Sequence, residues 1–478
     1  MMLLKKLFNG LIKFRRNKQK MKHIIHIVLS IVLLSICNNI FGQNLKRKGM
    51  LGIRYEAIND SIAKTLGLSK TTGILIKDII EGYTASKAKL HKGDVITAIN
   101  ENEINSSGDL LSAIAGQREG YEIVFEVIRK EKYLKIITKV VPKPYESYKN
   151  AEVIYDEIPF SKGYLRCIID KPADKGKYPA IFFIQGYTCS SIDNMGETHA
   201  YDRVLRGLLA KGYVIFKTEK PGMGDCQGTG ECDEIDFFTE LSAFQAAYDQ
   251  LDKYEFIDRD NIFIFGHSIG GVIASLLKQS LKAKGIAVYG TVVNSWFEYF
   301  VETNRLQNIF MGADYMENDL QFHKKLPFLY EFMVLKKSPK ELAKDSVNKE
   351  ILEKEWQWDG GNKIMSRNYL YWQQLQEPGQ IEAWKNTGSF VLSIWGAADF
   401  VAFSPDEHKT IADVVNYYHP GKGKYMEIPE IDHSFTKVAD RFEAAKYWFD
   451  NEYRINNFNP AIIEELDKWM KELMNSKE

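Results

Sequence analysis

The chain has 478 residues, a length that predicts two or three domains. Its 63 basic residues balance 63 acidic ones, so no net charge favours binding to nucleic acid or to an anionic membrane. Apolar residues make up 45% of the sequence, which is enough for a large hydrophobic core.

Residues 1–42 predict a signal peptide. Lysines and arginines precede an apolar run from Ile24 to Ile36, and small and polar residues follow up to Gly42. The run is too short to cross a bilayer comfortably, because a spanning helix needs about 20 apolar residues. We expect cleavage after Gly42 and an exported protein, periplasmic or secreted, without a stable membrane span. An uncleaved signal would instead anchor the chain.

Two alternatives concern the same segment. Translation from Met21 would leave a signal peptide of ordinary length. Lipidation would use Cys37, but Ile36 is large for the position before a lipidated cysteine. After cleavage four cysteines remain, which allow three full disulfide connectivities in an oxidising compartment or, alternatively, buried free thiols: Cys167, Cys189, Cys226 and Cys232.

Residues 47–142 predict a small β-rich domain. Short apolar or alternating runs with turn residues between them indicate strands, and the spacing from Asp109 to Ile114 indicates a helix. The domain resembles a PDZ domain of the type attached to bacterial secreted proteases. The resemblance rests on Leu51-Gly52-Ile53, Gly73-Ile74-Leu75-Ile76, Gly93-Asp94-Val95-Ile96 and Asp109-Leu110.

The PDZ resemblance implies a groove that captures a polypeptide C-terminus by strand addition. The loop that binds the terminal carboxylate would be Met50, Leu51, Gly52 and Ile53, opposite a helix near Leu111. The alternative is a groove that only packs against the following domain. Residues 143–150 predict a polar linker that Pro142 and Pro144 keep extended.

Residues 151–478 predict a second domain. Apolar strands alternate with helices, which indicates a mostly parallel sheet covered on both faces. One strand, Ile262 to Phe265, leads into Gly266-His267-Ser268-Ile269-Gly270 and then a helix. This strand–turn–helix pattern is typical of a nucleophile elbow, which exposes a serine hydroxyl on a strained turn. The alternative is a glycine-rich turn with an uninvolved serine.

From about Val153 to the C-terminus the sequence resembles the α/β-hydrolase superfamily. The resemblance implies an α/β fold with the catalytic order Ser268, acid, histidine. His433 follows the last predicted strand, where the superfamily has its base, whereas we expect His323 in a cap and His408 and His419 on the surface.

The acid is expected after the strand that ends at Trp395, in Gly396-Ala397-Ala398-Asp399. Asp399 is preferred over Asp432, because the side chains of neighbouring residues usually diverge and Asp432 has the place of a turn former. The oxyanion donors are expected to be the backbone N–H groups of Ile269 and Tyr187. The loop with Tyr187 departs from the glycine-rich run of lipases.

Within the resemblance, Cys189 and Cys232 lie in neighbouring loops, and we predict a disulfide between them. Between about 295 and 385 the alternation of strands and helices stops and aromatic residues accumulate. The resemblance implies that this insertion is a helical cap that forms an apolar wall of the substrate pocket. The alternative is that the aromatic residues only form the core of the cap.

The sequence contains no metal-binding spacing, phosphate loop or dinucleotide motif, so we expect no cofactor. The preferred hypothesis is an exported serine hydrolase that cleaves an ester or related acyl bond of a small molecule. A second is a serine peptidase to which the PDZ domain recruits polypeptide ends. A third is a binding protein centred on the PDZ domain, with an inactive hydrolase fold.

Overall fold

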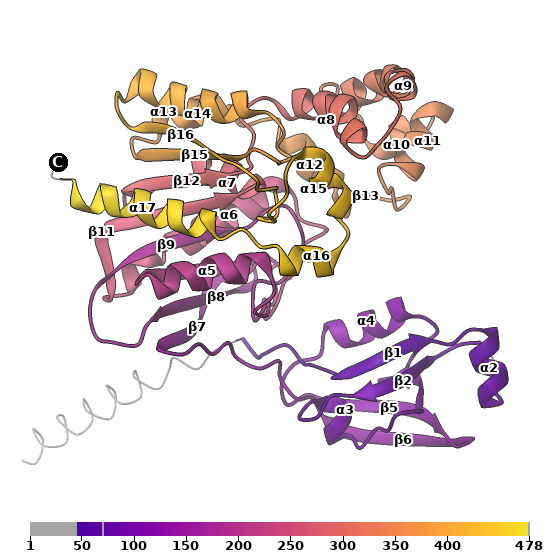
Figure 1. Ribbon diagram of the computed structural model, residues 1–478. Coiled ribbons are helices and arrows are strands. Elements are labelled where there is room, and N and C mark those ends of the chain that lie inside the picture. Colours follow the sequence, from indigo (N-terminus) through magenta and orange to yellow (C-terminus); the bar gives the residue numbers. More distant parts are fainter. Residues whose placement is uncertain (1–44, 69–70, 477–478) are drawn as a thin grey trace, which may run out of the picture. The chain divides into compact units, whose positions relative to one another are not determined.

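The computed structural model describes residues 45–68 and 71–476 (Figure 1). The predicted signal peptide, its cleavage position at Gly42 and the lipidation candidate Cys37 lie outside these residues. Among the helices of the described ranges, none combines the length and the apolar character that crossing a membrane requires.

The β-rich part of the chain is an antiparallel sheet with three short helices. The strand order is β1-β2-β3-β5-β6, and β4 pairs with β3. The strands are β1 (Ile53–Ala57), β2 (Ile74–Ile79), β3 (Val95–Ile99), β4 (Asn102–Glu103), β5 (Glu122–Arg129) and β6 (Lys132–Lys139). The helices are α2 (Asp60–Leu66), α3 (Thr84–Lys87) and α4 (Ser107–Ala115).

The larger sheet has the strand order β16-β15-β12-β11-β9-β10-β8-β7. The strands are β7 (Ala151–Phe160), β8 (Gly163–Pro172), β9 (Tyr178–Ile184), β10 (Val214–Thr218), β11 (Ile257–His267), β12 (Gly285–Tyr289), β15 (Phe390–Gly396) and β16 (Gly423–Ile428). The strands from β10 to β16 in this order are parallel, and β7 and β8 are antiparallel. The mostly parallel sheet predicted from the sequence is confirmed.

Helices cover both faces of this sheet, which explains why its central strands are apolar throughout. Alternate residues of β9 enter two separate cores: Ala180 and Phe182 in one, Ile181 and Phe183 in the other. The second core contains α5 (Ala200–Ala210) and α17 (Ala461–Asn475), which lie side by side in Figure 1. The first contains α6 (Phe237–Tyr248), α7 (Ile269–Leu276) and α14 (Pro405–Tyr418).

The segment between β12 and β15 is mostly helical, as predicted. It contains α8 (Trp296–Phe310), α9 (Tyr315–Met333), α10 (Pro339–Leu342), α11 (Ser346–Lys354), α12 (Tyr369–Gln374) and α13 (Gln380–Asn386). It also contains a short hairpin, β13 (Lys363–Ile364) and β14 (Arg367–Asn368), which was not predicted. Helix α13 packs against α7 and α14, so it covers the sheet instead of extending the cap. The remaining helices are η1 (Leu251–Lys253), α15 (Arg441–Tyr447) and α16 (Asn451–Asn456).

The predicted linker is irregular, but it is not a free spacer. Glu146 in this segment is buried, and its carboxylate lies 2.6 Å from the Nζ atom of Lys217 on β10. The backbone N–H of Glu146 donates to the hydroxyl of Tyr155 on β7. Composition and prolines predict an extended chain, but they carry no information about these contacts with distant residues.

Candidate active site

Ser268 stands between β11 and α7 in a strained conformation, with φ of 57° and ψ of −127°. A positive φ is uncommon for a residue with a side chain, and such strain is typical of functional turns. The two glycines of the motif permit the turn, as predicted. A Cβ at Gly266 would collide with the carbonyl of Gly270, and a Cβ at Gly270 would collide with that of Ile184 on β9.

His433 and Asp399 form a buried pair. The Nδ1 atom of His433 lies 2.8 Å from Oδ2 of Asp399. The other carboxylate oxygen accepts the backbone N–H groups of Val401 and Ala402 at 2.7 and 2.8 Å. Burial raises the pKa of Asp399, but His433 and these N–H groups lower it by more than burial raises it. The net pKa is therefore below its ordinary value. An ionised Asp399 accepts the Nδ1–H proton, which leaves Nε2 of His433 as a base.

Gly290, just after β12, leaves room for this pair. A Cβ there would lie 2.8 Å from Nδ1 of His433 and 3.0 Å from Oδ2 of Asp399. Its φ is +60°, which a glycine adopts without strain. The ends of the three parallel strands β11, β12 and β15 therefore meet at one site, since Ser268, Gly290 and Asp399 follow them directly.

His267, the residue before the serine, connects three parts of the site. Its Nε2 lies 2.9 Å from the carbonyl oxygen of His433, and its Nδ1 lies 2.6 Å from the hydroxyl of Tyr201 on α5. Because a carbonyl can only accept, Nε2 carries the proton and Nδ1 accepts from Tyr201. The same hydroxyl accepts the backbone N–H of Gly186 at 3.3 Å. Burial lowers the pKa of His267 to about 3, so this arrangement stays neutral in ordinary buffers.

The Ser268 side chain is half-buried, and its hydroxyl has no hydrogen-bond partner within the part of the chain that the structure describes. Its backbone N–H donates to the carbonyl of Tyr289 at 2.9 Å. Catalytic hydrogen bonds are often long or open without substrate, so this geometry is compatible with a nucleophile.

The two predicted oxyanion donors flank the serine. Ile269 is the first residue of α7, and the first N–H groups of a helix have no partner within it. Tyr187 follows Gly186, where a Cβ would lie 3.3 Å from the Cβ of Ser268. The segment that we call the oxyanion loop, residues 185–199 between β9 and α5, therefore begins directly beside the nucleophile.

Two buried cations bind the carbonyls at the start of the oxyanion loop. Lys220 donates to the carbonyl of Gly186 at 2.6 Å, and Arg367 on β14 donates to that of Tyr187 at 2.7 Å. Both cations pair with Glu240 on α6, at 2.8 and 2.7 Å. Since a carbonyl and the following N–H point in opposite directions, these bonds orient the loop's N–H groups.

Burial lowers the pKa of Lys220 to about 8, although Glu240 raises it. Burial raises the pKa of Glu240, but Lys220 and Arg367 lower it to a net value below the ordinary one. At neutral pH the pair is therefore charged. Sequence reasoning missed these three residues and also His267 and Tyr201. Only Lys220 carried a signal, because it is a lysine two positions after the buried strand β10.

The four residues considered as alternatives to the predicted acid and base have other environments. The Asp432 carboxylate accepts the N–H groups of Ser434 and Thr436, which makes it a turn residue as predicted. His323 is exposed on α9, in the predicted cap. His408 was predicted on the surface, and this is wrong. It is completely buried, and its Nε2 accepts the N–H of Thr291. The acidic start of α14 suggested a solvent-facing helix, but the sequence does not show which side of a helix is covered.

His419, the last of the alternatives, lies at the end of α14, and its Nε2 lies 2.7 Å from the carbonyl of Lys385. The predicted disulfide between Cys189 and Cys232 is present. It joins the oxyanion loop to the loop between β10 and α6, residues 219–236. The other two cysteines, Cys167 and Cys226, are buried free thiols.

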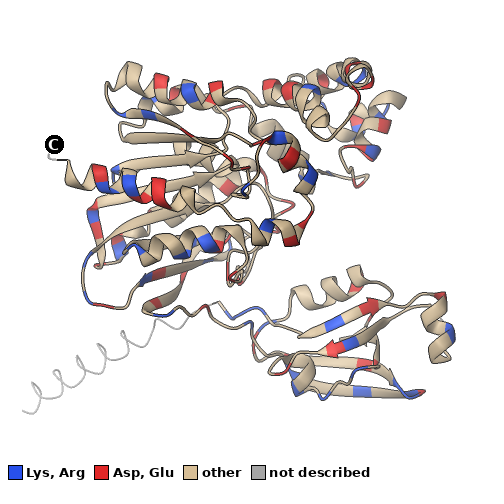
Figure 2. Cartoon of the chain, viewed as in Figure 1, with Lys and Arg blue, Asp and Glu red and all other residues tan. Residues whose placement is uncertain are grey.

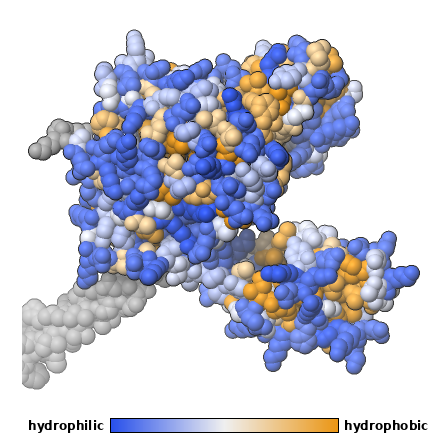
Figure 3. Space-filling view, in the orientation of Figure 1, coloured by the Kyte–Doolittle hydropathy of each residue, from blue (hydrophilic) through white to orange (hydrophobic). Residues whose placement is uncertain are grey.

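The cap brings aromatic side chains to the oxyanion loop. The ring of Tyr187 lies 5.5 Å from that of Trp372, and Trp372 contacts Trp296 and Phe300. Most of these rings are buried in the cap's own core, as the alternative interpretation proposed, but Tyr187 remains 39% exposed. Figure 3 shows apolar residues over α8 and α9, where Met311, Met316 and Leu320 are exposed.

The predicted carboxylate loop of the β-rich domain has a suitable backbone. The carbonyls of Met50, Leu51 and Gly52 accept the N–H groups of Thr84, Ala85 and Ile80, respectively. The N–H of Met50 donates to the carbonyl of Val141, which leaves the N–H groups of Leu51 and Gly52 as the candidates for binding a carboxylate. Strand β1 follows this loop at the edge of the sheet, and four of its five residues are exposed. Figure 3 shows apolar surface near β1 and α4, and Leu111 on α4 is 56% exposed.

Charge and metal-binding groups add no further site. Figure 2 shows acidic and basic residues interspersed along the helices and strands. In residues 45–68 and 71–476, no group of three or more His, Cys, Asp and Glu side chains is arranged to bind a metal ion.

Comparison with known proteins concerns the two parts of the chain separately. Residues 49–140 match the family model described as PDZ domain. A relative named probable periplasmic serine endoprotease DegP-like, from Chlamydia muridarum, is 31% identical over 117 residues, 24% of this chain and 24% of the relative. The chain therefore spans about a quarter of the length of the curated relatives that it matches.

Solved structures resemble the larger part. Est1E from Butyrivibrio proteoclasticus with bound ferulic acid is 16% identical, with a TM-score of 0.43, and the match covers 67% of this chain and 99% of that one. The esterase domain of a Rhodothermus marinus protein is 14% identical, with a TM-score of 0.37, and the match covers 67% and 98%. Similarity at this distance concerns the fold alone.

The strand order of the larger sheet, the helices that connect its parallel strands and the strained serine after β11 together are typical of the α/β-hydrolase fold. The chain therefore combines a PDZ domain at residues 49–140 with an α/β-hydrolase fold.

Proposed function

We propose that the protein is a serine hydrolase that cleaves an ester or related acyl bond. Two observations support this proposal: the buried pair of His433 and Asp399, and the strained turn that holds Ser268. A serine hydroxyl is a weak nucleophile at neutral pH and needs a base with an orienting carboxylate.

In the proposed reaction, His433 accepts the Ser268 proton at Nε2 while Oγ attacks the acyl carbon. The N–H groups of Ile269 and Tyr187 stabilise the oxyanion. The imidazolium then donates its proton to the departing alcohol, which leaves an acyl-enzyme. Water, deprotonated by His433, attacks the acyl carbon, and the acid and free serine are released.

The test uses purified residues 43–478, a fluorophosphonate probe, and small-ester and peptide substrates in parallel. We expect labelling and ester turnover, both lost in Ser268→Ala with an unchanged circular dichroism spectrum. Ser242→Ala, which changes an exposed serine on α6, is the matched control. Full activity of Ser268→Ala would exclude this nucleophile, and turnover of peptides alone would favour the peptidase hypothesis.

For the PDZ domain we propose capture of a polypeptide C-terminus between β1 and α4. The inward carbonyls of the carboxylate loop and the exposed edge of β1 support it. Peptides with a free C-terminus should bind more tightly than their amidated forms in a fluorescence titration, and Leu111→Asp should weaken binding of the free form. Equal affinity for both peptide forms would exclude recognition of the carboxylate.

We also propose that the protein is exported to the periplasm or secreted. The Cys189–Cys232 disulfide supports this, because disulfides persist in oxidising compartments. N-terminal sequencing of the mature protein should begin at Gln43. A mature chain that retains residues 1–42 would support anchoring by the signal.

A further inference from the structure

Arg47, which precedes the PDZ domain in sequence, is buried among hydrolase residues. It is 1% exposed. Its Nη1 lies 2.6 Å from Oδ2 of Asp193 and 2.7 Å from Oδ2 of Asp225, although these residues are 146 and 178 positions away. Its other nitrogens donate to the carbonyls of Lys143 and Pro144, at 3.2 and 2.6 Å.

The two carboxylates belong to different loops at the active-site edge of the sheet. Asp193 lies in the oxyanion loop, and Asp225 lies in the loop between β10 and α6 that also contains Lys220. These are the two loops that the Cys189–Cys232 disulfide joins. Arg47 therefore makes a second connection between them, and a guanidinium suits this role because its fork can serve several acceptors at once.

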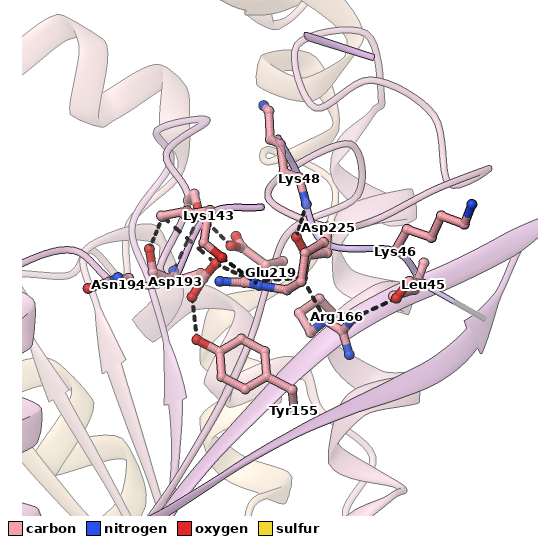
Figure 4. Close-up of polar contacts among 12 residues, drawn as sticks. Leu45, Lys46, Lys48, Lys143, Tyr155, Arg166, Asp193, Asn194, Glu219 and Asp225 are labelled. Atoms are coloured by element: carbon pink, nitrogen blue, oxygen red, sulfur yellow. Dashed lines mark hydrogen bonds and ion pairs between the residues drawn. The ribbon is translucent and has the colours of Figure 1, made fainter. Parts of the chain in front are cut away.

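The neighbours of Arg47 bind the same region. The backbone N–H of Lys48 donates to Oδ1 of Asp225 at 2.7 Å, and Arg166 on β8 donates to the carbonyl of Leu45 at 3.2 Å. Figure 4 shows Lys48, Asp225, Arg166 and Leu45 in this cluster. Asp225 also has a cation within the hydrolase fold, since Nε of Arg166 lies 3.1 Å from it.

Asp193 differs from Asp225 in the origin of its cations. Its ion pairs within the described part of the chain are with Arg47 and with Lys143, whose Nζ lies 3.8 Å from Oδ2 and also donates to the Asp193 carbonyl. Both cations come from the segments on either side of the PDZ domain, residues 45–48 and 143–146, which we call the flanking segments. In the second of them, Glu146 accepts the N–H of Asn194 at 2.5 Å. Figure 4 shows Lys143, Asp193 and Asn194 together.

Burial lowers the pKa of Arg47, but Asp193 and Asp225 raise it to a net value above the ordinary one. The guanidinium is therefore charged at every pH at which the protein is folded. Its Cζ atom lies 4.7 and 4.6 Å from the ring centroids of Tyr145 and Tyr155, which contact each other edge to face, and the Tyr155 hydroxyl donates to Asp193.

We propose that Arg47 is a positioning residue of the hydrolase site, and that the flanking segments complete the oxyanion loop. Arg47 does not touch the substrate. It fixes Asp193, six positions after Tyr187, and so limits movement of the N–H groups that the oxyanion requires. The catalytic role of Arg47 rests on the proposed serine hydrolysis, but the connection between the flanking segments and the oxyanion loop does not.

The test compares Arg47→Met, Arg47→Lys and Lys143→Met in residues 43–478, with Arg259→Met, which changes an exposed arginine on β11, as the matched control. Arg47→Met should lower kcat for a small ester about 10- to 100-fold with little change in KM, because small displacements of positioning groups cost this much. The rate of fluorophosphonate labelling of Ser268 should fall in parallel. Arg47→Lys should recover part of the loss, since lysine keeps the charge but not the fork.

A second measurement does not depend on activity. Backbone hydrogen exchange in residues 187–195 should be faster in Arg47→Met than in the wild type and unchanged in Arg259→Met. If Arg47→Met does not fold, Lys143→Met provides the comparison, because Lys143 is partly exposed and its loss leaves no buried gap.

Wild-type exchange together with wild-type kcat in Arg47→Met or Lys143→Met would overturn the inference. Faster exchange in a protein whose wild type neither reacts with the probe nor hydrolyses esters would instead exclude the proposed function and keep the structural connection. Faster exchange with unchanged kcat would show that the flanking segments stabilise the loop without affecting catalysis, and would also overturn the inference.

Discussion

At the scale of single residues, the candidate site depends on groups whose charge state is set by burial and hydrogen bonds together. Asp399 has two backbone donors and His433, which keep it ionised. His267 is kept neutral by burial, which lowers its pKa although the bond to the His433 carbonyl raises it. Both residues are buried, so desolvation alone would favour the neutral form of each. Specific partners therefore decide the charge of Asp399, whereas desolvation decides that of His267.

Asp399→Asn should lower kcat about 10⁴-fold with a smaller change in KM, because an amide cannot stabilise the imidazolium or select its tautomer. Steady-state kinetics on a small ester measures both constants. Asp432→Asn is the matched control, since an asparagine can still accept the N–H groups of the turn. A larger loss in Asp432→Asn than in Asp399→Asn would reverse the assignment of the acid.

Glu219 predicts a pH dependence of stability. Its carboxylate is fully buried and accepts from Ser191 and from the N–H of Ile192 in the oxyanion loop. Burial raises its pKa from 4.5 to about 7, although these bonds lower it. Between these values the folded state binds more protons than the unfolded state, so this residue's contribution to the free energy of unfolding is full below pH 4.5 and is lost as the pH rises to about 7.

Glu219→Gln lacks this contribution. The free energy of unfolding of the variant minus that of the wild type should therefore be larger at pH 8 than at pH 5, by at most about 3 kcal/mol. Urea unfolding at both pH values, with exposed Glu255→Gln as a control, measures the difference. If the difference in free energy of unfolding between Glu219→Gln and the wild type is equal at pH 5 and pH 8, Glu219 does not titrate in this range.

At the scale of elements, the oxyanion loop is bound by other parts of the chain at several positions from Gly186 to Asn194. Lys220 and Arg367 bind its first carbonyls, the disulfide holds its middle, and Arg47 and Lys143 bind Asp193. Arg367 belongs to the hairpin of the cap, so the cap also contributes to the loop's position. A loop with this many partners is a fixed element, which is what an oxyanion site requires.

Lys220→Met should lower both stability and kcat. It leaves Glu240 buried beside one cation instead of two and removes the donor to the Gly186 carbonyl. Loss of one member of a buried pair typically costs about 3–5 kcal/mol. Adding Glu240→Gln should restore part of the melting temperature but not kcat, because the bond to Gly186 is absent in both variants.

Thermal unfolding and ester kinetics on the single and double variants separate these effects. Lys211→Met, which changes a surface lysine on the hydrolase domain, is the matched control. Recovery of kcat in the double variant would show that Lys220 acts only through stability and does not orient the loop.

At the scale of the whole molecule, the segments on both sides of the PDZ domain, residues 45–48 and 143–146, contact the hydrolase fold. The N–H of Lys143 donates to the carbonyl of Lys48 at 2.8 Å, so the two flanking segments are neighbours. The PDZ domain is inserted between them. Its removal therefore has different consequences depending on where the chain is cut.

Two deletions test this organisation. Removal of residues 1–150 takes away Arg47, Lys143 and Glu146, and leaves Asp193 buried without its cations. We expect a lower melting temperature and little ester turnover. Replacement of residues 50–141 by a two-residue turn keeps both flanking segments. This protein should have a higher melting temperature and a higher ester turnover than the first deletion. Equal behaviour of the two proteins in thermal unfolding and ester assays would show that the flanking segments do not matter.

Much of the architecture can be predicted from the sequence, because it follows from local patterns. Apolar runs indicate buried strands, and Gly266-His267-Ser268-Ile269-Gly270 requires a specific turn, since its glycines are the residues that avoid collisions there. The order of Ser268, Asp399 and His433 along the chain follows from the order of the strands that precede them. These features depend on residues close together in sequence or on a resemblance that local motifs carry.

Only the tertiary structure decided which charged side chains are buried and which residues they meet. Arg47 and Asp193 are far apart in sequence, and nothing near Arg47 distinguishes it from a surface arginine. Lys220, Glu240 and Arg367 come from a loop, a helix and the cap, and His408 lies inside although its neighbours are acidic. The physical reason is that the stability of a buried charge depends on partners from distant elements, which a local pattern does not specify.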